Sequence, residues 1–369
     1  MNGKRVTSYD LANELGISAS YVSRALNNHP AISKKVKDAV KKKAAELKYK
    51  HNSHAVNLRR GSSKILGVIV PHINQSFFSE AIAGIEEACF ENNHSLIICQ
   101  SHESLKHECI AVETLIHQNV DCILISISAE TQTATHLEEI AIHDIHLIQF
   151  DRYLDALDSY KVLNDNKEAS YSAVKKLIAE GYQRIAFLGG PEHVTIFKNR
   201  KKGYLEAIKE AELSIPYNFI IDNAFSREKG NKAAYELLSF KEPPDAFFTV
   251  SDHQSLGVLQ AANDLDIKVP EQLGIFGFAN EAFTELIKPT LSSVDQKSKE
   301  LGKCAANLYF KNILPGTEAT ETNKKKIIKS EVIVRESSSR TILPQLKQKR
   351  QKNSKINTRT NAVKAHKVV

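Results

Sequence analysis

The most constraining feature of this sequence is an alternation that begins at Ile65. From there, short apolar runs alternate with stretches whose apolar residues recur at helical spacing. The apolar runs predict strands at 65–70, 95–100, 122–126, 146–150, 184–188, 219–221, 246–250 and 274–278. The stretches between them predict helices that include 79–91, 108–118, 169–180, 203–211 and 255–265. Such an order is typical of doubly wound parallel α/β sheets, and this many strands favours two lobes over one sheet.

Charge is distributed unevenly along the 369 residues. Residues 1–64 hold 14 Lys and Arg against four acidic residues, a net charge of +10. Residues 337–369 hold nine Lys and Arg and no acid, so the total of +7 leaves −12 for the segment between. A basic head and tail around an acidic body indicate that the head binds a polyanion, and that the body has a different role.

Several classes of protein are disfavoured by the composition and by missing motifs. The five cysteines are odd in number and form no CxxC pair, so we expect neither a disulfide framework nor structural zinc. No signal-peptide core lies near the start, and no apolar run is long enough to span a bilayer, so we expect a cytoplasmic protein with no membrane partner. Nucleophile-elbow, phosphate-loop and HExxH motifs are missing, so the sequence predicts no catalytic site, metal site or cofactor.

Residues 7–26 predict two short helices around a tight turn at Gly16, and a third helix spans about 33–47. The second helix of such a helix-turn-helix projects side chains toward the major groove of DNA. Arg24 can read guanine with two hydrogen bonds, whereas serine and tyrosine hydroxyls more often hold phosphates. A lysine-coated three-helix bundle of another kind is the alternative, and the charge of this segment favours DNA. The candidate DNA contacts of this headpiece are Thr7, Ala19, Ser20, Tyr21, Ser23, Arg24 and Asn27.

The run VTSYDLANELGISASYVSRALN at 6–27 closely resembles the N-terminal headpiece of the lactose-repressor (LacI/GalR) family, and so does YKHNSHAVNL at 49–58. The resemblance extends to about Arg335. It implies a transcriptional regulator, a repressor or an activator, that binds pseudo-palindromic operator DNA as a homodimer. It also implies that operator affinity is switched by a small effector, expected to be a sugar or sugar derivative.

In that family the stretch matching 52–60 is a hinge helix that orders on the operator. Leu58 matches the leucine that enters the minor groove, and Ala55 matches the alanine that packs against the dimer mate. An apolar wedge bends the duplex, while Arg59 would meet phosphates. An apolar residue in an ordinary linker is the alternative. His51 stands where the family usually has proline, so the entry to the hinge differs.

The resemblance also implies a periplasmic-binding-protein-like sensor, which binds its effector between two lobes at the carboxyl ends of strands. Phe77 and Phe78 match aromatic positions that border the ligand, although each could instead be core. Arg200 matches the family arginine that bonds the ligand, although it lies in a basic run that could simply be solvated. Asp252 matches a position that accepts hydroxyl hydrogen bonds, and it could also cap the helix that follows.

Four further candidates complete the expected effector site: Asp151, Arg152, Asn280 and Gln296. Ala279 occupies the place where the family often has an aspartate, and Asn280 could partly replace that group. Because the contact set has changed, control by a protein partner stays an alternative to a small effector. A solute-binding protein and an α/β enzyme are further alternatives, and the fused basic head argues against the first of these.

These observations predict four regions. They are a headpiece at 1–50, a hinge helix and linker at 51–64, a two-lobed sensor and dimerisation domain at 65–336, and a basic disordered tail at 337–369. Within the sensor we expect one lobe from 65–163 and 294–336, and the other from 164–293.

Overall fold

The computed structural model describes residues 6–49, 62–314 and 323–340. It divides into two units, Met1–Ser63 and Lys64–Val369. The expected hinge residues Ala55, Leu58 and Arg59 lie outside the described residues, as does the tail from 341 onward. In the part of the chain that is described, no helix is long and apolar enough to cross a membrane, and no group of His, Cys, Asp and Glu side chains is placed to hold a metal ion.

Within residues 6–49, the described main part of the first unit, three helices form a bundle, as predicted. Thr7 begins the first of them with a capping box, because its hydroxyl accepts the Asp10 N–H while the Asp10 carboxylate accepts the Thr7 N–H. Gly16, at φ 63°, ends that helix, and the Ser18 side chain caps the next. The buried side chains include Leu11, Ala12, Val22, Ala25 and Val40. The helices are α1 (Ser8–Leu15), α2 (Ala19–Leu26) and α3 (Lys34–Glu46).

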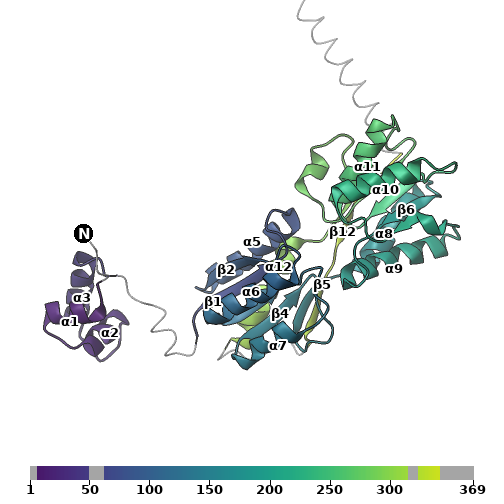
Figure 1. The fold of residues 1–369 in the computed structure, drawn as a ribbon. Helices are drawn as coiled ribbons and strands as arrows, with labels where there is room; N and C mark the ends of the chain where they lie inside the picture. The colour runs from purple at the N-terminus through teal and green to yellow at the C-terminus, as the bar shows by residue number, and fades with distance from the viewer. Residues whose placement is uncertain (1–5, 50–61, 315–322, 341–369) are drawn as a thin grey trace, which may run out of the picture. The chain divides into compact units, whose positions relative to one another are not determined.

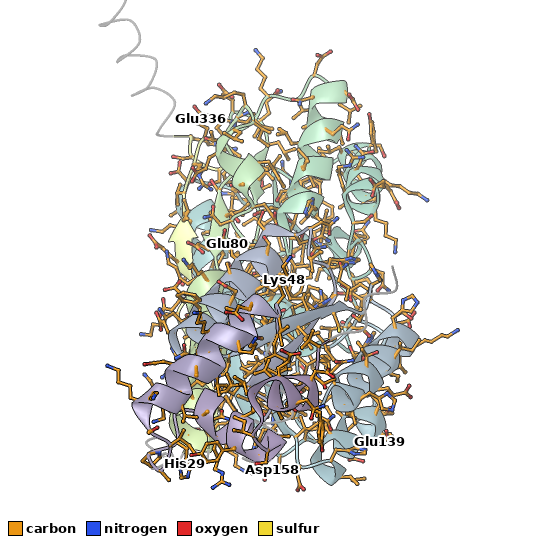
Figure 2. The ribbon with its side chains drawn as sticks, turned by 90° about the vertical axis from the view of Figure 1, so that its left-hand side faces the viewer. His29, Lys48, Glu80, Glu139, Asp158 and Glu336 are labelled. Atoms are coloured by element: carbon orange, nitrogen blue, oxygen red, sulfur yellow. The ribbon has the colours of Figure 1, made fainter. Side chains whose placement is uncertain are left out.

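The first lobe of the second unit is a parallel six-stranded sheet in the order β11-β5-β4-β3-β1-β2. Its strands are β1 (Ile65–Val70), β2 (Ser95–Gln100), β3 (Cys122–Ile125), β4 (His146–Phe150), β5 (Tyr160–Asn164) and β11 (Lys325–Ile328). One face packs on α5 (Ser76–Glu91) and α12 (Ser298–Leu308), and the other packs on α6 (Leu105–His117) and α7 (Thr135–Ile142). The charged side chains of Glu80 on α5 and Glu139 on α7 lie on the outside of this lobe (Figure 2).

The second lobe is a parallel four-stranded sheet in the order β7-β6-β8-β9. Its strands are β6 (Ile185–Leu188), β7 (Ile220–Ile221), β8 (Ala246–Thr249) and β9 (Gly274–Phe276). Helices α8 (Asn166–Ala179) and α9 (Thr195–Glu210) cover one face, and α10 (Arg227–Leu238) and α11 (Asp252–Asp264) cover the other (Figure 1). Both sheets are doubly wound, which confirms the predicted fold class.

Three segments join the lobes: the one after β5, the one through β10 (Ser293–Asp295), and the one from β11 into β12 (Glu331–Ile333). Strands β10 and β12 pair antiparallel between the lobes. The buried side-chain amide of Asn164 donates to the carbonyl oxygens of Gln296, at 2.8 Å, and Ile328, at 3.2 Å. One side chain therefore ties all three connecting segments together.

Residues 337–340, expected to begin a disordered tail beyond the end of the first lobe at 336, are instead ordered and pack on the second lobe. After β11 the chain returns to the second lobe, where the Ser337 hydroxyl donates to the Ile275 carbonyl at 2.7 Å. The guanidinium of Arg340 lies 4.0 Å from the ring centroid of Tyr182. Ser337, Ser338 and Ser339 are buried, and their hydroxyls find hydrogen-bond partners. This serine-rich segment therefore belongs to the folded lobe, although its composition is typical of a linker.

Replacing Asn164 with alanine should destabilise the two-lobed unit by about 1–3 kcal/mol, because two buried carbonyl groups lose their donor. Urea unfolding of the full chain followed by circular dichroism measures this. Asn74→Ala, at an exposed asparagine, is the matched control. Equal midpoints for Asn164→Ala and the control would contradict the role of this amide.

Candidate functional site

The headpiece presents only part of the predicted DNA-contact set to solvent. Ser20 and Arg24 are exposed and lie one helical turn apart on α2. Tyr21 and Ser23 are half-buried. Ala19, which we expected to project outward, instead packs with Tyr21 against the headpiece core. The exposed face of α2 therefore offers a hydroxyl and a guanidinium side by side.

Thr7 and Asn27 have structural roles at helix ends. Thr7 is exposed and forms the capping box of α1. The Asn27 amide donates to the Ser23 carbonyl at 2.7 Å, which ends α2. Beside these helices, α3 carries exposed lysines, among them Lys34, Lys35 and Lys42, which suit phosphate contacts.

A cleft lies between the two lobes, and it gathers six of the eight predicted effector residues. The lining of the cleft comes from the start of α5, from the ends of β4, β8 and β9, from α9 and from the β10 segment, and strand ends are the usual place for ligands in parallel sheets. The predicted residues that line it are Phe77, Phe78, Asp151, Arg152, Arg200 and Gln296.

Arg200 is buried and rigidly held in this cleft. Its Nε donates to Asn166 at 2.8 Å, and its Nη1 donates to the Val250 carbonyl at 2.7 Å. The guanidinium lies 3.6 Å from the ring centroid of Phe278. Burial lowers the pKa of Arg200 to about 9, although the carboxylates of Asp151 and Asp252 oppose this. The group therefore stays cationic at neutral pH, and neither hydrogen bond uses Nη2.

Arg152 enters the cleft from the first lobe and forms an ion pair with Glu103 at 2.7 Å. Its Cζ lies 5.7–6.0 Å from the rings of Phe78, Phe197 and Phe225, so aromatic side chains of both lobes surround it. Burial alone raises the pKa of Glu103, but the charge and hydrogen bonds of Arg152 outweigh that effect and leave it below the usual value. Glu103 was not predicted, and its local sequence carries no signal for this pairing.

Asp151 lies beside Arg152 at the end of β4. Its backbone is left-handed, at φ 57°, which is unusual for a residue other than glycine. Its carboxylate accepts from the Ser126 hydroxyl at 3.3 Å and lies 3.9 Å from Nε of Arg152. Burial raises the pKa of Asp151 despite the two nearby arginines.

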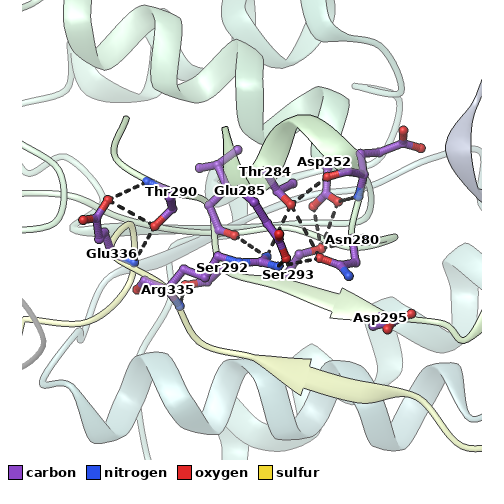
Figure 3. Close-up of polar contacts among 12 residues, drawn as sticks. Asp252, Asn280, Thr284, Glu285, Thr290, Ser292, Ser293, Asp295, Arg335 and Glu336 are labelled. Atoms are coloured by element: carbon purple, nitrogen blue, oxygen red, sulfur yellow. Dashed lines mark hydrogen bonds and ion pairs between the residues drawn. The ribbon is translucent and has the colours of Figure 1, made fainter. Parts of the chain in front are cut away.

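Asp252 and Asn280 do not line this cleft. The Asp252 carboxylate is fully buried, and it accepts from the Ser293 hydroxyl at 2.7 Å and from the Glu281 N–H at 2.8 Å (Figure 3). The Asn280 side chain accepts from Arg335 at 2.9 Å. Both side chains anchor the loop after β9 instead of facing the cleft.

Two side chains that sequence analysis missed join the lobes across the cleft. Glu281 is buried and lines the cleft, and its carboxylate accepts the Ser76 N–H, at 3.2 Å, from the first turn of α5. The His193 ring donates from Nε2 to the Ala129 carbonyl at 2.5 Å. Glutamate and histidine on loops give no periodic signal, so these contacts depend on the tertiary fold.

The cleft is nearly closed, with a volume of about 50 Å³, room for only a few waters. A larger hollow of about 960 Å³ runs along α5 and α12 and shares Phe77 and Ala279 with the cleft. Size alone would favour the hollow as the ligand site. The cleft is nevertheless the stronger candidate, because buried charged and aromatic side chains converge there.

A helix-turn-helix unit joined to a two-lobed parallel α/β unit defines the class of DNA-binding regulators that carry a periplasmic-binding-protein-like domain. The family model described as bacterial regulatory proteins, lacI family, matches residues 7–52, and that of the periplasmic binding protein-like domain matches 174–338. The chain belongs to the lacI family and is a DNA-binding transcriptional regulator.

Two curated relatives and one solved structure illustrate the similarity. The HTH-type transcriptional regulator DegA of Bacillus subtilis is 31% identical over 336 residues, which cover 91% of this chain and 98% of DegA. The ribose operon repressor of Haemophilus influenzae is 28% identical over 331 residues, 90% of this chain and 98% of that protein. The Lac repressor dimer bound to operator and the anti-inducer ONPF shares the fold, with a TM-score of 0.78 and 20% identity over 91% of this chain and 100% of that one.

The buried Asp252 carboxyl should make stability depend on pH. Burial raises its pKa from 3.8 to about 7, so its contribution to stability is fully present below pH 3.8 and is lost as the pH rises through 7. The Asp252→Asn variant has no carboxyl group at this position and therefore no proton to lose over this pH range. Between pH 5 and pH 7 the wild type should therefore lose about 2 kcal/mol of unfolding free energy relative to the variant. Denaturant unfolding at both pH values measures the difference, and parallel pH curves would contradict this assignment.

Proposed function

We propose that this chain is a repressor that binds a pseudo-palindromic operator as a homodimer in the cytoplasm. Its operator affinity is switched by a carbohydrate effector held between the lobes. The observation that carries the proposal is the cleft itself, where Arg200 and Arg152 meet a set of aromatic rings at the ends of parallel strands. Polar groups that bond hydroxyls and rings that stack on a sugar's apolar face suit this class of ligand. The name of the ribose operon repressor, a relative along nearly the whole chain, supports the same class.

On the DNA side, Ser20 and Arg24 would face the major groove. Leu58 would enter the minor groove at the operator centre, Ala55 would pack against the dimer mate, and Arg59 would meet phosphates. Effector binding would change the relative orientation of the lobes and thereby shift the population between DNA-competent and DNA-incompetent states. We propose no catalytic step and no cofactor for this cleft, since the curated relatives above are regulators.

Control by a protein partner is the second candidate. The hollow along α5 and α12 favours it, because this hollow is far larger than the cleft and charged side chains such as Lys299, Lys303 and Glu87 line it. A partner with complementary charges could bind there without opening the lobes.

Operator recognition should depend on Arg24. In vitro selection with the full-length protein should recover a short palindrome. Arg24→Ala should then weaken binding to it by about 1–3 kcal/mol per half-site, because the two hydrogen bonds to a base are lost. Arg24→Lys is the matched variant, since it keeps the charge but cannot form the paired contact. Fluorescence anisotropy on selected and scrambled DNA measures both, and equal affinity of the wild type for the two DNAs would refute sequence-specific binding.

Effector response should depend on Arg200. Arg200→Ala should keep its operator affinity but lose the change in that affinity that a sugar produces in the wild type. Lys201→Ala is the control, because the neighbouring Lys201 is engaged with Glu192 and Asp222 and does not line the cleft. An unchanged sugar response in Arg200→Ala would place the effector elsewhere.

A further inference from the structure

We infer that Glu281 is the ligand-binding acid of the second lobe, and that it selects an uncharged, polyhydroxylated effector over an anionic one. This inference rests on the proposed function, because it assigns chemistry to the same cleft. Four observations support it: the turn after β9, the position of the carboxylate, its contact across the cleft, and the charge balance of the side chains around it.

The turn after β9 brings residue 281 to the cleft. Ala279 and Asn280 have consecutive left-handed conformations, at φ 114° and φ 54°. Ala279 offers no polar side-chain group, and the Asn280 side chain is bonded to Arg335. The first side chain after β9 that can offer a hydrogen-bond acceptor to the cleft is therefore that of Glu281.

The backbone of this turn is fixed at three successive N–H groups. That of Ala279 donates to the Val294 carbonyl at 2.9 Å, that of Asn280 to the Ser293 hydroxyl at 2.9 Å, and that of Glu281 to the Asp252 carboxylate at 2.8 Å. A side chain on such a turn is held before the ligand arrives, so little entropy is lost when it binds.

The carboxylate of Glu281 is in position to bind two partners at once. Its Oε2 accepts the Ser76 N–H at 3.2 Å, at the start of α5 in the other lobe. The Ser76 bond leaves Oε1 for a ligand hydroxyl, so one residue can hold the ligand while it holds the two lobes together.

The charges around Glu281 decide which ligands are accepted. Arg152 is neutralised by Glu103 at 2.7 Å, and Asp151 lies 3.9 Å from it. Within the described residues, Glu281 forms no ion pair of its own. The cleft and its surroundings thus hold two arginines, Arg152 and Arg200, against three acidic side chains, Glu103, Asp151 and Glu281, so an anionic ligand would add to an excess of negative charge. A neutral polyol can instead donate to Glu281 and accept from Nη2 of Arg200.

The test measures the melting temperature of the full-length protein with neutral monosaccharides and disaccharides, and with the matching uronic acids and sugar phosphates. A neutral sugar should raise the melting temperature, and its acidic counterparts should not. Glu281→Gln keeps the shape and the Ser76 contact but loses the charge. It should bind the neutral sugar roughly ten- to a hundredfold more weakly and should bind the acidic counterpart more tightly than the wild type does.

Glu139→Gln, at an exposed glutamate of α7, is the matched control and should behave as the wild type (Figure 2). The circular dichroism spectrum without sugar should be equal in all three proteins, which separates loss of a ligand contact from misfolding. A neutral sugar that binds Glu281→Gln as it binds the wild type would overturn this inference alone, as would a wild type that prefers the acidic sugar. No shift with any compound would overturn both this inference and the proposed effector.

Discussion

The two-lobed unit depends on the buried amide of Asn164. Each lobe has its own sheet and its own core, so the lobes act together only if the segments between them move as one. Asn164 donates to two of these segments from the third, and Asp165 beside it accepts the Ser330 N–H at 2.8 Å. Gln296 donates back to Asn164 at 3.2 Å and also lines the cleft. The connecting segments and the cleft therefore share Gln296, and a displacement of the segments would move a residue of the cleft.

Close helix packing makes the first lobe a rigid body around this junction. A Cβ atom on Gly84 of α5 would lie 2.0 Å from the Lys299 carbonyl oxygen of α12, and one on Gly302 of α12 would lie 2.0 Å from the Ala81 carbonyl oxygen. The two backbones touch, and neither helix can slide without a clash. Motion is then confined to the connecting segments, which is the condition for hinge closure.

Much of the fold could be predicted because its central strands are uninterrupted apolar runs. β1, β2 and β4 have the predicted bounds, whereas α5 and α11 both begin three residues before the predicted start. The first turn of α11 carries the polar side chains of residues 252–254, which periodicity does not register. β5 and β11 were missed because lysines interrupt them near the sheet edge. Six of eight effector candidates line the cleft, and all but Arg200, which lies within α9, follow a strand or lie at the start of a helix. Glu103 and Glu281 could not be found, because left-handed backbone and contacts from distant segments place them.

The few hydrogen bonds between the lobes would set the energy scale of the proposed switch. Two hydrogen bonds hold the lobes together, one between Glu281 and Ser76 and one between His193 and Ala129. The cleft between the lobes has a volume of about 50 Å³, which is too small for a sugar. The proposed effector would therefore enter when the lobes are apart, and its effect would equal the difference between its affinities for the separated and the closed forms. Each of these hydrogen bonds contributes only about 0.5–1.5 kcal/mol, so ligand contacts of ordinary strength can reverse the balance. Because Glu281 would bond both the ligand and α5, occupancy of the cleft and closure of the lobes would be a single event.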